Sequence, residues 1–244
     1  MCGISEYVTI NEEDAVLKPY KVDISKAAAC SSAITSMQAL EYLNVGDRVL
    51  IIGGSNDIGL PMIQLMKLYG ASYVTVTSSN SRCCMCQGAD EVIDPEIVNY
   101  WEMEEFKKDK FDKIFDTIGR QSKHAAHVLK KENDGGMFID ASGLFNDSHS
   151  IMLPPWYKGI ILKPLWSIIS QQHKNPKCVT LFPQTVNVFD LKKVLALMED
   201  DKLCIQISER SPLPFNEDGV KEAFENIFDC NGCNFRSTIQ IHEQ

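Results

Sequence analysis

The stretch RVLIIGGSNDIG, residues 48–59, decides the fold of this chain. It begins with a continuous apolar run, RVLIIG (48–53), which is typical of a strand buried on both faces of a parallel sheet. A turn with glycines follows, and then apolar residues recur at helical spacing until Gly70, namely Ile58, Met62, Leu65, Met66 and Tyr69. The stretch therefore predicts a strand, a tight turn and a helix with one apolar face.

Strand-like and helix-like segments alternate outward from this stretch. Further strands are expected at 73–79, 91–94, 112–119, 135–143, 178–182 and 237–241. Helices are expected at 25–43, from 81 to a stop at Gly88, at 101–110 as a solvated helix, at 122–131, 187–200 and 217–228. ISEYVTI (4–10) has the pattern of a strand without a partner. The alternation predicts an α/β fold with a doubly wound, parallel, Rossmann-type sheet.

The composition is that of an ordinary globular protein. Of 244 residues, 44% are hydrophobic, and the net charge of -9 with a pI near 5.1 argues against nucleic acid as the main partner. The start has neither a secretory signal nor a mitochondrial presequence pattern. The apolar stretch 151–169 is interrupted by three prolines and two lysines, so we expect no membrane span. The chain as given is expected to be soluble and intracellular.

The glycine turn is the first candidate binding element. In a dinucleotide site, glycines permit the tight turn, the close approach of the diphosphate and the packing of helix on strand. Gly53 suits the turn and Gly59 the packing, whereas Asn56 stands at the position of close approach. Asn tolerates unusual backbone angles. Asp57 is a good helix N-cap, but its carboxylate would repel a diphosphate unless it turns away.

The end of the second strand indicates which coenzyme is bound. Enzymes that prefer NAD usually carry an acidic residue there for the ribose hydroxyls. This chain has TSSNSR (77–82), in which Ser78, Ser79 and Arg82 suit the 2′-phosphate of NADP. A plain serine-rich turn is the alternative interpretation. The ends of the later strands, at Thr117, Ile118 and Gly119 and at Ala141, Ser142 and Gly143, would face the nicotinamide.

No acid–base set of a hydrolase is visible in the sequence. It has no Ser-His-Asp pattern and no paired carboxylates in a loop, which fits hydride transfer, where the coenzyme performs the difficult step. His124 and His127 have a metal-compatible spacing, but we interpret them as surface residues. The cysteines of CCMC (83–86) and CNGC (230–233) are interpreted as free thiols, with a shared zinc site as the alternative; no metal is predicted.

The chain resembles the zinc-free, quinone-reductase-like branch of the medium-chain dehydrogenases/reductases, and within it the reticulon-4-interacting, mitochondrial-type quinone oxidoreductases. The segments that carry the resemblance run from KPYKVDISKAAACSSAITSMQALEYLNVGDRVLIIGGSNDIG through QGADEVIDP and FDKIFDTIG to GGMFIDASG. The resemblance implies a Rossmann-type NADPH domain packed on a GroES-like catalytic lobe. It implies hydride transfer from NADPH to quinones or other α,β-unsaturated carbonyls (enones), and a mitochondrial location; the alternative, if the chain is complete as given, is cytoplasmic.

The same resemblance assigns residues and domains. It implies a remnant of the GroES-like lobe at 1–24, the NADP-binding domain at 25–184 and a C-terminal return at 185–244. It adds Thr35 and Arg236 to the coenzyme site, and it matches the loop Gly53, Gly54, Ser55, Asn56, Asp57 and Ile58 to the family's glycine loop. No catalytic residue is assigned. A homodimer is among the expected assemblies, because a lost lobe would leave an exposed edge.

Three departures from the family's pattern lead to a second hypothesis. Asn56 and Asp57 stand where the family usually has glycines, Pro95 replaces a tyrosine, and most of the catalytic lobe would lie upstream of the first residue. The first hypothesis is an NADPH-dependent oxidoreductase of a quinone or enone that is weak or inactive as this chain alone. The second is a non-catalytic module that binds NADP(H) or another protein. Half a cleft would position an acceptor poorly.

Overall fold

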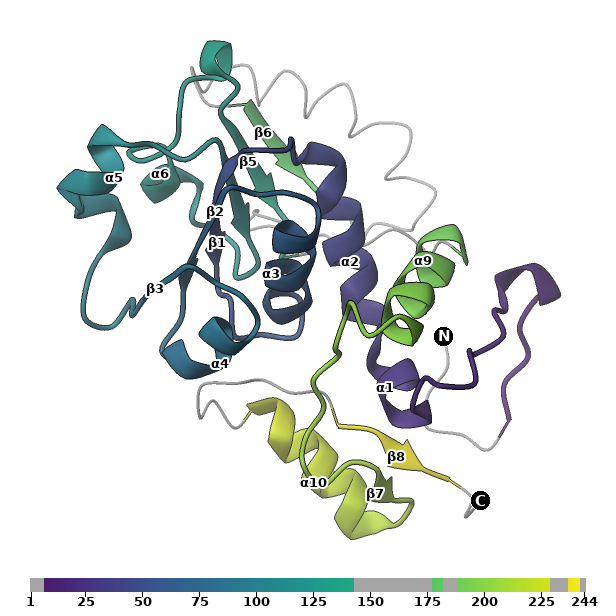
Figure 1. Cartoon of the computed structure of the whole chain (residues 1–244). Coiled ribbons are helices and arrows are strands. Elements are labelled where there is room, and N and C mark those ends of the chain that lie inside the picture. The colour runs from purple at the N-terminus through teal and green to yellow at the C-terminus, as the bar shows by residue number, and fades with distance from the viewer. Residues whose placement is uncertain (1–6, 143–176, 182–187, 229–236, 242–244) are drawn as a thin grey trace, which may run out of the picture.

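A six-stranded parallel sheet forms the centre of the molecule (Figure 1). The computed structural model describes residues 7–142, 177–181, 188–228 and 237–241. The sheet has the order β3-β2-β1-β4-β5-β6, and every neighbouring pair is parallel. Its strands are β1 (Arg48–Ile52), β2 (Tyr73–Thr77), β3 (Glu91–Ile93), β4 (Lys113–Asp116), β5 (Met137–Asp140) and β6 (Lys177–Thr180). This is the strand order of doubly wound dinucleotide-binding folds, so the predicted fold class is confirmed.

The two faces of the sheet bury different residues of the same strands. In β1, Val49 and Ile51 join a core cluster with residues of α3 (Gly59–Leu68) and with Cys84 of α4 (Ser81–Cys86). Leu50 and Ile52 join another cluster, which contains Phe106 of α5 (Glu104–Lys108) and Ala125 of α6 (Ser122–Ala125). The continuous apolar run of β1 is therefore explained by burial on both faces.

A third cluster joins the sheet layer to more distant helices. α1 (Ile24–Ala29) and α2 (Ser31–Ala39) precede the sheet in the chain, and α2 packs beside α3 and α9 (Val188–Glu199) (Figure 1). Met37, Leu65 and Val194 meet in this cluster. The C-terminal elements β7 (Leu213–Pro214), α10 (Glu217–Phe228) and β8 (Ile239–Gln240) form a separate two-stranded parallel sheet with its helix. No helix in the described part of the chain is long and apolar enough to cross a membrane.

Several predicted elements differ in the structure. Residues 7–10, the described part of the expected strand 4–10, belong to no strand; a 3-10 helix lies at Glu12–Asp14. The expected helix 25–43 is α1 and α2 with a break at Cys30, followed by a 3-10 helix at Leu40–Tyr42. The last strand lies in the small sheet rather than in the central one. The predicted domain boundaries stay a prediction.

The helices α5 and α6 are shorter than predicted. The expected helix 101–110 is a 3-10 helix (Tyr100–Glu102) followed by α5. The Glu and Lys side chains of α5 are exposed, as expected of a solvated helix, whereas Phe106 is buried in the core. The expected helix 122–131 ends early at Ala125, and Leu129 instead forms a parallel bridge with Phe111. Apolar side chains at these positions bury against the sheet, which outweighs the local helical pattern.

Candidate coenzyme-binding site

The strand order reverses between β1 and β4. From β1 the chain proceeds outward to β2 and β3, and from β4 it proceeds in the opposite direction to β5 and β6. Ile52 ends β1 opposite Asp116, which ends β4. Ligands of open α/β sheets bind outside the carboxyl ends of the strands at such a switch point, because the connections diverge there and leave a crevice. The glycine turn follows β1 directly and therefore lies at this point.

The glycines of the turn are required by the protein's own packing. Gly53 has a φ of +85°, and its amide donates to the Thr77 hydroxyl at 3.1 Å, which joins the turn to the end of β2. A Cβ at Gly54 would collide with the Val76 side chain, and one at Gly59 would collide with the Gly53 carbonyl. The turn is thus as tight as the dinucleotide-binding motif demands.

The Asn56 side chain forms several hydrogen bonds within and beyond the turn. Its Oδ1 accepts hydrogen bonds from the amides of Ile58 at 3.0 Å and Gly59 at 2.7 Å, and its backbone carbonyl accepts from Leu60 at 3.1 Å. Asn56 is therefore the residue that caps the first turn of α3; the prediction placed Asp57 in that role. The Nδ2 of Asn56 donates to the Thr117 hydroxyl at 2.7 Å.

The backbone of Asn56 is not unusual. Among the described residues other than glycine, positive φ occurs at Arg120 and Asp201. The tolerance of Asn for unusual backbone angles is therefore not what places it in the turn. Its side-chain hydrogen bonds are the structural reason for an asparagine at this position.

The residues after β2 divide into a buried and an exposed group. Ser78 is buried, and its hydroxyl accepts a hydrogen bond from the Asn80 amide at 2.9 Å. Burial raises the pKa of the neighbouring Cys84 thiol to about 11, although a hydrogen bond with Ser78 opposes that rise. Ser79 and Arg82 are exposed, so they are the members of this group that a ligand can reach from solvent.

The other predicted coenzyme residues lie on several elements. Ile118 is half-exposed beside Gly53, at the turn after β4, and Gly119 follows it with a φ of +94°. Ala141 is buried at the end of β5, and the hydroxyl of Ser142 donates to Asp140 at 2.6 Å. Thr35 is partly buried on α2, whereas Arg236 and Gly143 lie outside the described residues.

Two buried carboxylates at this edge were missed by the sequence reasoning. Asp116 and Asp140 are register partners at the ends of β4 and β5, and both are buried. The Asp116 carboxylate accepts from the amides of Ile118 at 3.0 Å, Gly119 at 2.7 Å and Gln121 at 3.0 Å. Burial raises the pKa of Asp116 most, while these amides oppose the rise. The sequence signal that could have identified Asp116 is an Asp placed between an apolar strand and a glycine turn.

Sequence comparison assigns the chain to a family. The pattern of the family described as "Zinc-binding dehydrogenase" matches residues 87–229, which is more than half of the chain. The chain belongs to this family. Within it, the chain falls in the quinone-oxidoreductase branch of the medium-chain dehydrogenases/reductases, as its resemblance predicted.

Curated relatives of the family support that branch. The chain is 33% identical over 147 residues to "NAD(P)H oxidoreductase RTN4IP1, mitochondrial" of Danio rerio, covering 56% of this chain and 38% of the relative. It is 30% identical over 145 residues to the Homo sapiens protein of the same name, covering 56% of this chain and 36% of that one. The matched segment thus spans less than two fifths of each relative.

Solved structures of the family share the fold. A quinone oxidoreductase from Coxiella burnetii superposes with a TM-score of 0.64 at 22% identity, covering 93% of this chain and 64% of that chain. The Escherichia coli quinone oxidoreductase complexed with NADPH gives a TM-score of 0.62 at 17% identity, covering 89% and 67%. At these identities the likeness concerns the fold alone.

The family's description as zinc-binding raises the question whether this chain has a zinc site. Among the residues that the structure describes, no group of three or more His, Cys, Asp or Glu side chains is arranged to hold a metal ion. His124 is exposed and stacks on Trp101, with ring centroids 4.0 Å apart. The cysteines at 230 and 233 lie outside the described residues. A zinc-free chain stays a prediction.

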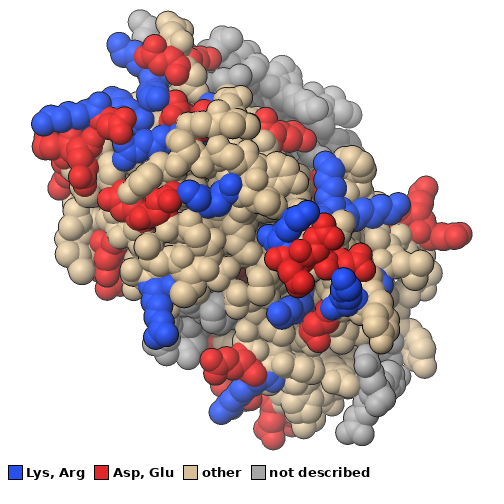
Figure 2. Space-filling view, in the orientation of Figure 1, with Lys and Arg blue, Asp and Glu red and all other residues tan. Residues whose placement is uncertain are grey.

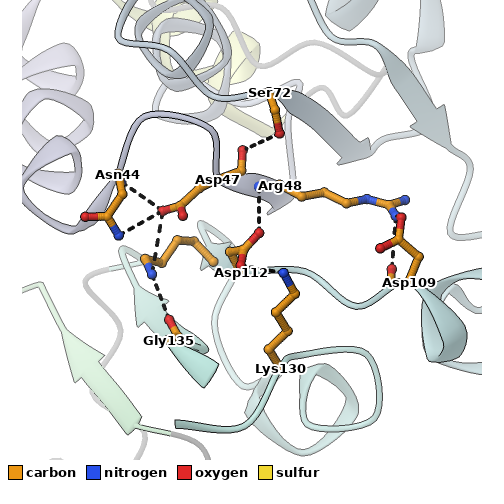
Figure 3. Close-up of polar contacts among 9 residues, drawn as sticks. Asn44, Asp47, Arg48, Ser72, Asp109, Asp112, Lys130 and Gly135 are labelled. Carbon is orange, nitrogen blue, oxygen red and sulfur yellow. Dashed lines mark hydrogen bonds and ion pairs between the residues drawn. The ribbon is translucent and has the colours of Figure 1, made fainter. Parts of the chain in front are cut away.

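A large polar network lies at the opposite, amino edge of the sheet (Figure 3). Lys113 is buried at the start of β4, where its Nζ donates to the Gly135 carbonyl at 2.8 Å and pairs with Asp47 at 3.6 Å. Asp112 accepts from the Arg48 amide at 2.9 Å and from Lys130 at 2.7 Å. Because ligands bind at the carboxyl edge in this fold, we interpret the network as structural.

Proposed function

We propose that this chain is the coenzyme-binding part of an NADPH-dependent oxidoreductase, which transfers a hydride to a quinone or another α,β-unsaturated carbonyl. The observation that carries the proposal is the tight glycine turn at the switch point between β1 and β4. Such a turn brings the backbone and the first amides of a helix to the place where a diphosphate binds in this fold. NADPH bound there by its diphosphate would supply the hydride from its nicotinamide ring.

The proposed site has three parts. Gly53, Gly54, Ser55, Asn56, Asp57 and Ile58 form the loop near the diphosphate. Ser79 and Arg82 are exposed beyond β2 and would meet the 2′-phosphate, with Ser78 buried beneath them. Arg82 offers a positive charge, and no acidic residue follows β2 to favour the ribose hydroxyls of NAD. The nicotinamide end would involve Thr35, Ile118, Gly119, Ala141, Ser142 and, outside the described residues, Arg236.

The substrate, the location and the assembly are proposed by analogy with the relatives. The relatives are named as mitochondrial NAD(P)H oxidoreductases and two structural neighbours as quinone oxidoreductases, so we propose a small-molecule quinone or enone as acceptor and a mitochondrial location. The chain spans only part of these relatives, and we propose that by itself it reduces acceptors weakly or not at all. A homodimer is proposed as its assembly. On the face shown in Figure 2, acidic and basic side chains are interspersed, and the net charge of -9 disfavours nucleic acid as a partner.

The contacts of Asn56 favour a second candidate function. Its carboxamide already occupies two amides of the first helical turn, which a diphosphate would otherwise use. A chain whose diphosphate position is filled by its own side chain could serve as a non-catalytic module. Such a module would bind NADP(H) weakly or present a surface to another protein.

Titration with NADPH distinguishes these candidates. The primary proposal expects a saturable change in NADPH fluorescence, competition by 2′,5′-ADP stronger than by 5′-AMP, and slow oxidation of NADPH on addition of a quinone. Saturable binding with no oxidation above the protein-free rate would favour the non-catalytic module. Absence of saturation up to millimolar NADPH would contradict both forms of coenzyme binding and leave the protein-interaction candidate.

A further inference from the structure

We infer that the Asn56 side chain is an internal competitor for the coenzyme diphosphate and lowers the affinity for NADPH. The inference rests on the proposed function and concerns how its site is controlled. It combines two contacts of one carboxamide, one to the helix that follows the turn and one to the strand end across the switch point.

The first contact concerns the hydrogen-bond donors. A diphosphate at the start of a helix is bound by backbone amides of the first turn. In this chain the amides of Ile58 and Gly59 donate to Asn56 Oδ1, at 3.0 Å and 2.7 Å. The same N–H group cannot make a full hydrogen bond to a phosphate oxygen and to Oδ1 at once. Coenzyme binding at these amides must therefore displace the carboxamide.

The second contact joins the carboxamide to the residue that follows the neighbouring strand. Asn56 lies in the turn after β1, whereas Thr117 follows β4 on the other side of the switch point. Nδ2 donates to the Thr117 Oγ1 at 2.7 Å, and that hydroxyl lies 2.8 Å from the carbonyls of both Ile52 and Gly53, which share its single hydrogen as acceptors. The Thr117 hydroxyl, which accepts from Asn56, is thus held in place by the backbone. This bond bridges the place where the fold positions a dinucleotide.

The side chain can be removed without rebuilding the turn. Asn56 is only partly buried, and it does not have the positive φ that would require glycine or asparagine. Alanine therefore fits its backbone, and the glycines that shape the turn are unaffected. Displacement of the carboxamide exchanges two hydrogen bonds for those of the phosphate and breaks the bond to Thr117. One net hydrogen bond corresponds to about a tenfold change in the dissociation constant.

The decisive experiment compares NADPH dissociation constants by fluorescence for the wild-type chain, Asn56→Ala and Asn216→Ala. Asn216 is the matched control, because its Oδ1 accepts from Gly219 at 2.8 Å and its carbonyl accepts from Val220 at 3.0 Å, at the start of α10 outside the central sheet. We expect about tenfold tighter binding for Asn56→Ala and no change for Asn216→Ala. Thermal unfolding checks that each variant is folded.

Two further measurements separate this inference from the proposed function. Asn56→Asp retains the capping oxygen and adds a negative charge, so NADPH should bind more weakly than to the wild-type chain. Hydrogen exchange of the Gly59 amide in the coenzyme-free protein should be faster in Asn56→Ala, because its acceptor is removed. Tighter NADPH binding by Asn56→Ala than by the wild-type chain, together with faster exchange of the Gly59 amide, would support the inference.

The contrary outcomes are also distinct. If the wild-type chain binds NADPH and Asn56→Ala binds equally well or more weakly, the inference is wrong and the proposed function stands. Unchanged exchange of the Gly59 amide would likewise contradict it. If none of the variants binds NADPH up to millimolar concentration, the proposed coenzyme function fails, and the inference fails with it.

Discussion

Gly54 and Asn56 lie two residues apart in the same turn and are constrained in different ways. Gly54 is required because it has no Cβ, and a Cβ there would collide with the Val76 side chain on β2. Asn56 is explained by the hydrogen bonds of its carboxamide, because the backbone there has no positive φ. Residues of one short turn therefore have to be interpreted separately, one by its packing and the other by its hydrogen bonds.

Gly54→Ala is expected to destabilise the fold by about 1–3 kcal/mol, because an added methyl group overpacks a tight contact. Urea denaturation measures the change in the free energy of unfolding. The double variant Gly54→Ala/Val76→Ala should lose less stability than the two single losses combined, since the smaller side chain at 76 makes room. Full additivity would contradict the collision as the cause.

Asp116 is expected to make stability depend on pH. Burial raises its folded-state pKa above the ordinary value of 3.8, so between about pH 4 and the folded pKa the native state holds more protons than the unfolded state. Its contribution to stability therefore falls as pH rises through that window. Asp116→Asn lacks this titration but places an amide group against the Gln121 N–H, which should cost about 1–3 kcal/mol.

Urea denaturation of both proteins across pH 4–7 checks this expectation. The advantage of the wild-type chain over Asp116→Asn should shrink as pH rises. An advantage that grows with pH would mean that the three amide hydrogen bonds outweigh burial and that the pKa of Asp116 is lowered.

At the scale of elements, α9 connects a late part of the chain to the helices before and after β1. Leu195 and Val194 pack in one cluster with Met37 of α2 and Leu65 of α3. α9 lies about 120 residues after α3 in the sequence, but in space the two share one core. The coenzyme domain is thus stabilised by residues from the predicted C-terminal return.

Leu195→Ala is expected to lower the free energy of unfolding by about 2–5 kcal/mol, because it creates a cavity in this cluster. Lys192→Ala on the exposed face of the same helix is the matched control and should change stability by less than about 0.5 kcal/mol. Denaturant unfolding of both variants makes the comparison. Equal effects would contradict the packing of Leu195 as a source of stability.

At the scale of the whole molecule, the two edges of the sheet have different tasks. The amino edge holds a network of buried and partly buried ion pairs around Lys113, Asp47 and Asp112 (Figure 3). The carboxyl edge holds the glycine turn and the turn after β4. A change at the amino edge should therefore alter stability without altering the affinity for coenzyme.

Lys113→Ala is expected to destabilise the protein by about 3–5 kcal/mol, since it leaves the mostly buried Asp47 carboxylate without its cation. The NADPH dissociation constant of the folded fraction should stay unchanged. Lys107→Ala, which breaks an exposed pair with Glu104, is the control and should cost less than about 1 kcal/mol. A larger NADPH dissociation constant in Lys113→Ala would show that the amino and carboxyl edges of the sheet are coupled.

The sequence by itself determined the order of strands and helices around the sheet, because strand and helix periodicities are local properties of short segments. All six central strands lie where apolar runs predicted them, and the helix after β1 ends just before Gly70 as expected. The predictions were wrong where packing overrides the local pattern, as at Leu129, which forms a bridge with Phe111 where a helix was expected.

The tertiary structure decided what the polar side chains of the candidate site do. Asn56 donates to Thr117, which lies 61 residues away in the sequence, so no local pattern could predict this contact. Asp116 and Asp140 become neighbours only through the register of β4 and β5. Hydrogen bonds depend on which atoms the fold brings within about 3 Å. The glycine turn can therefore be recognised from the local sequence, whereas its capacity to bind a diphosphate depends on the neighbouring strand.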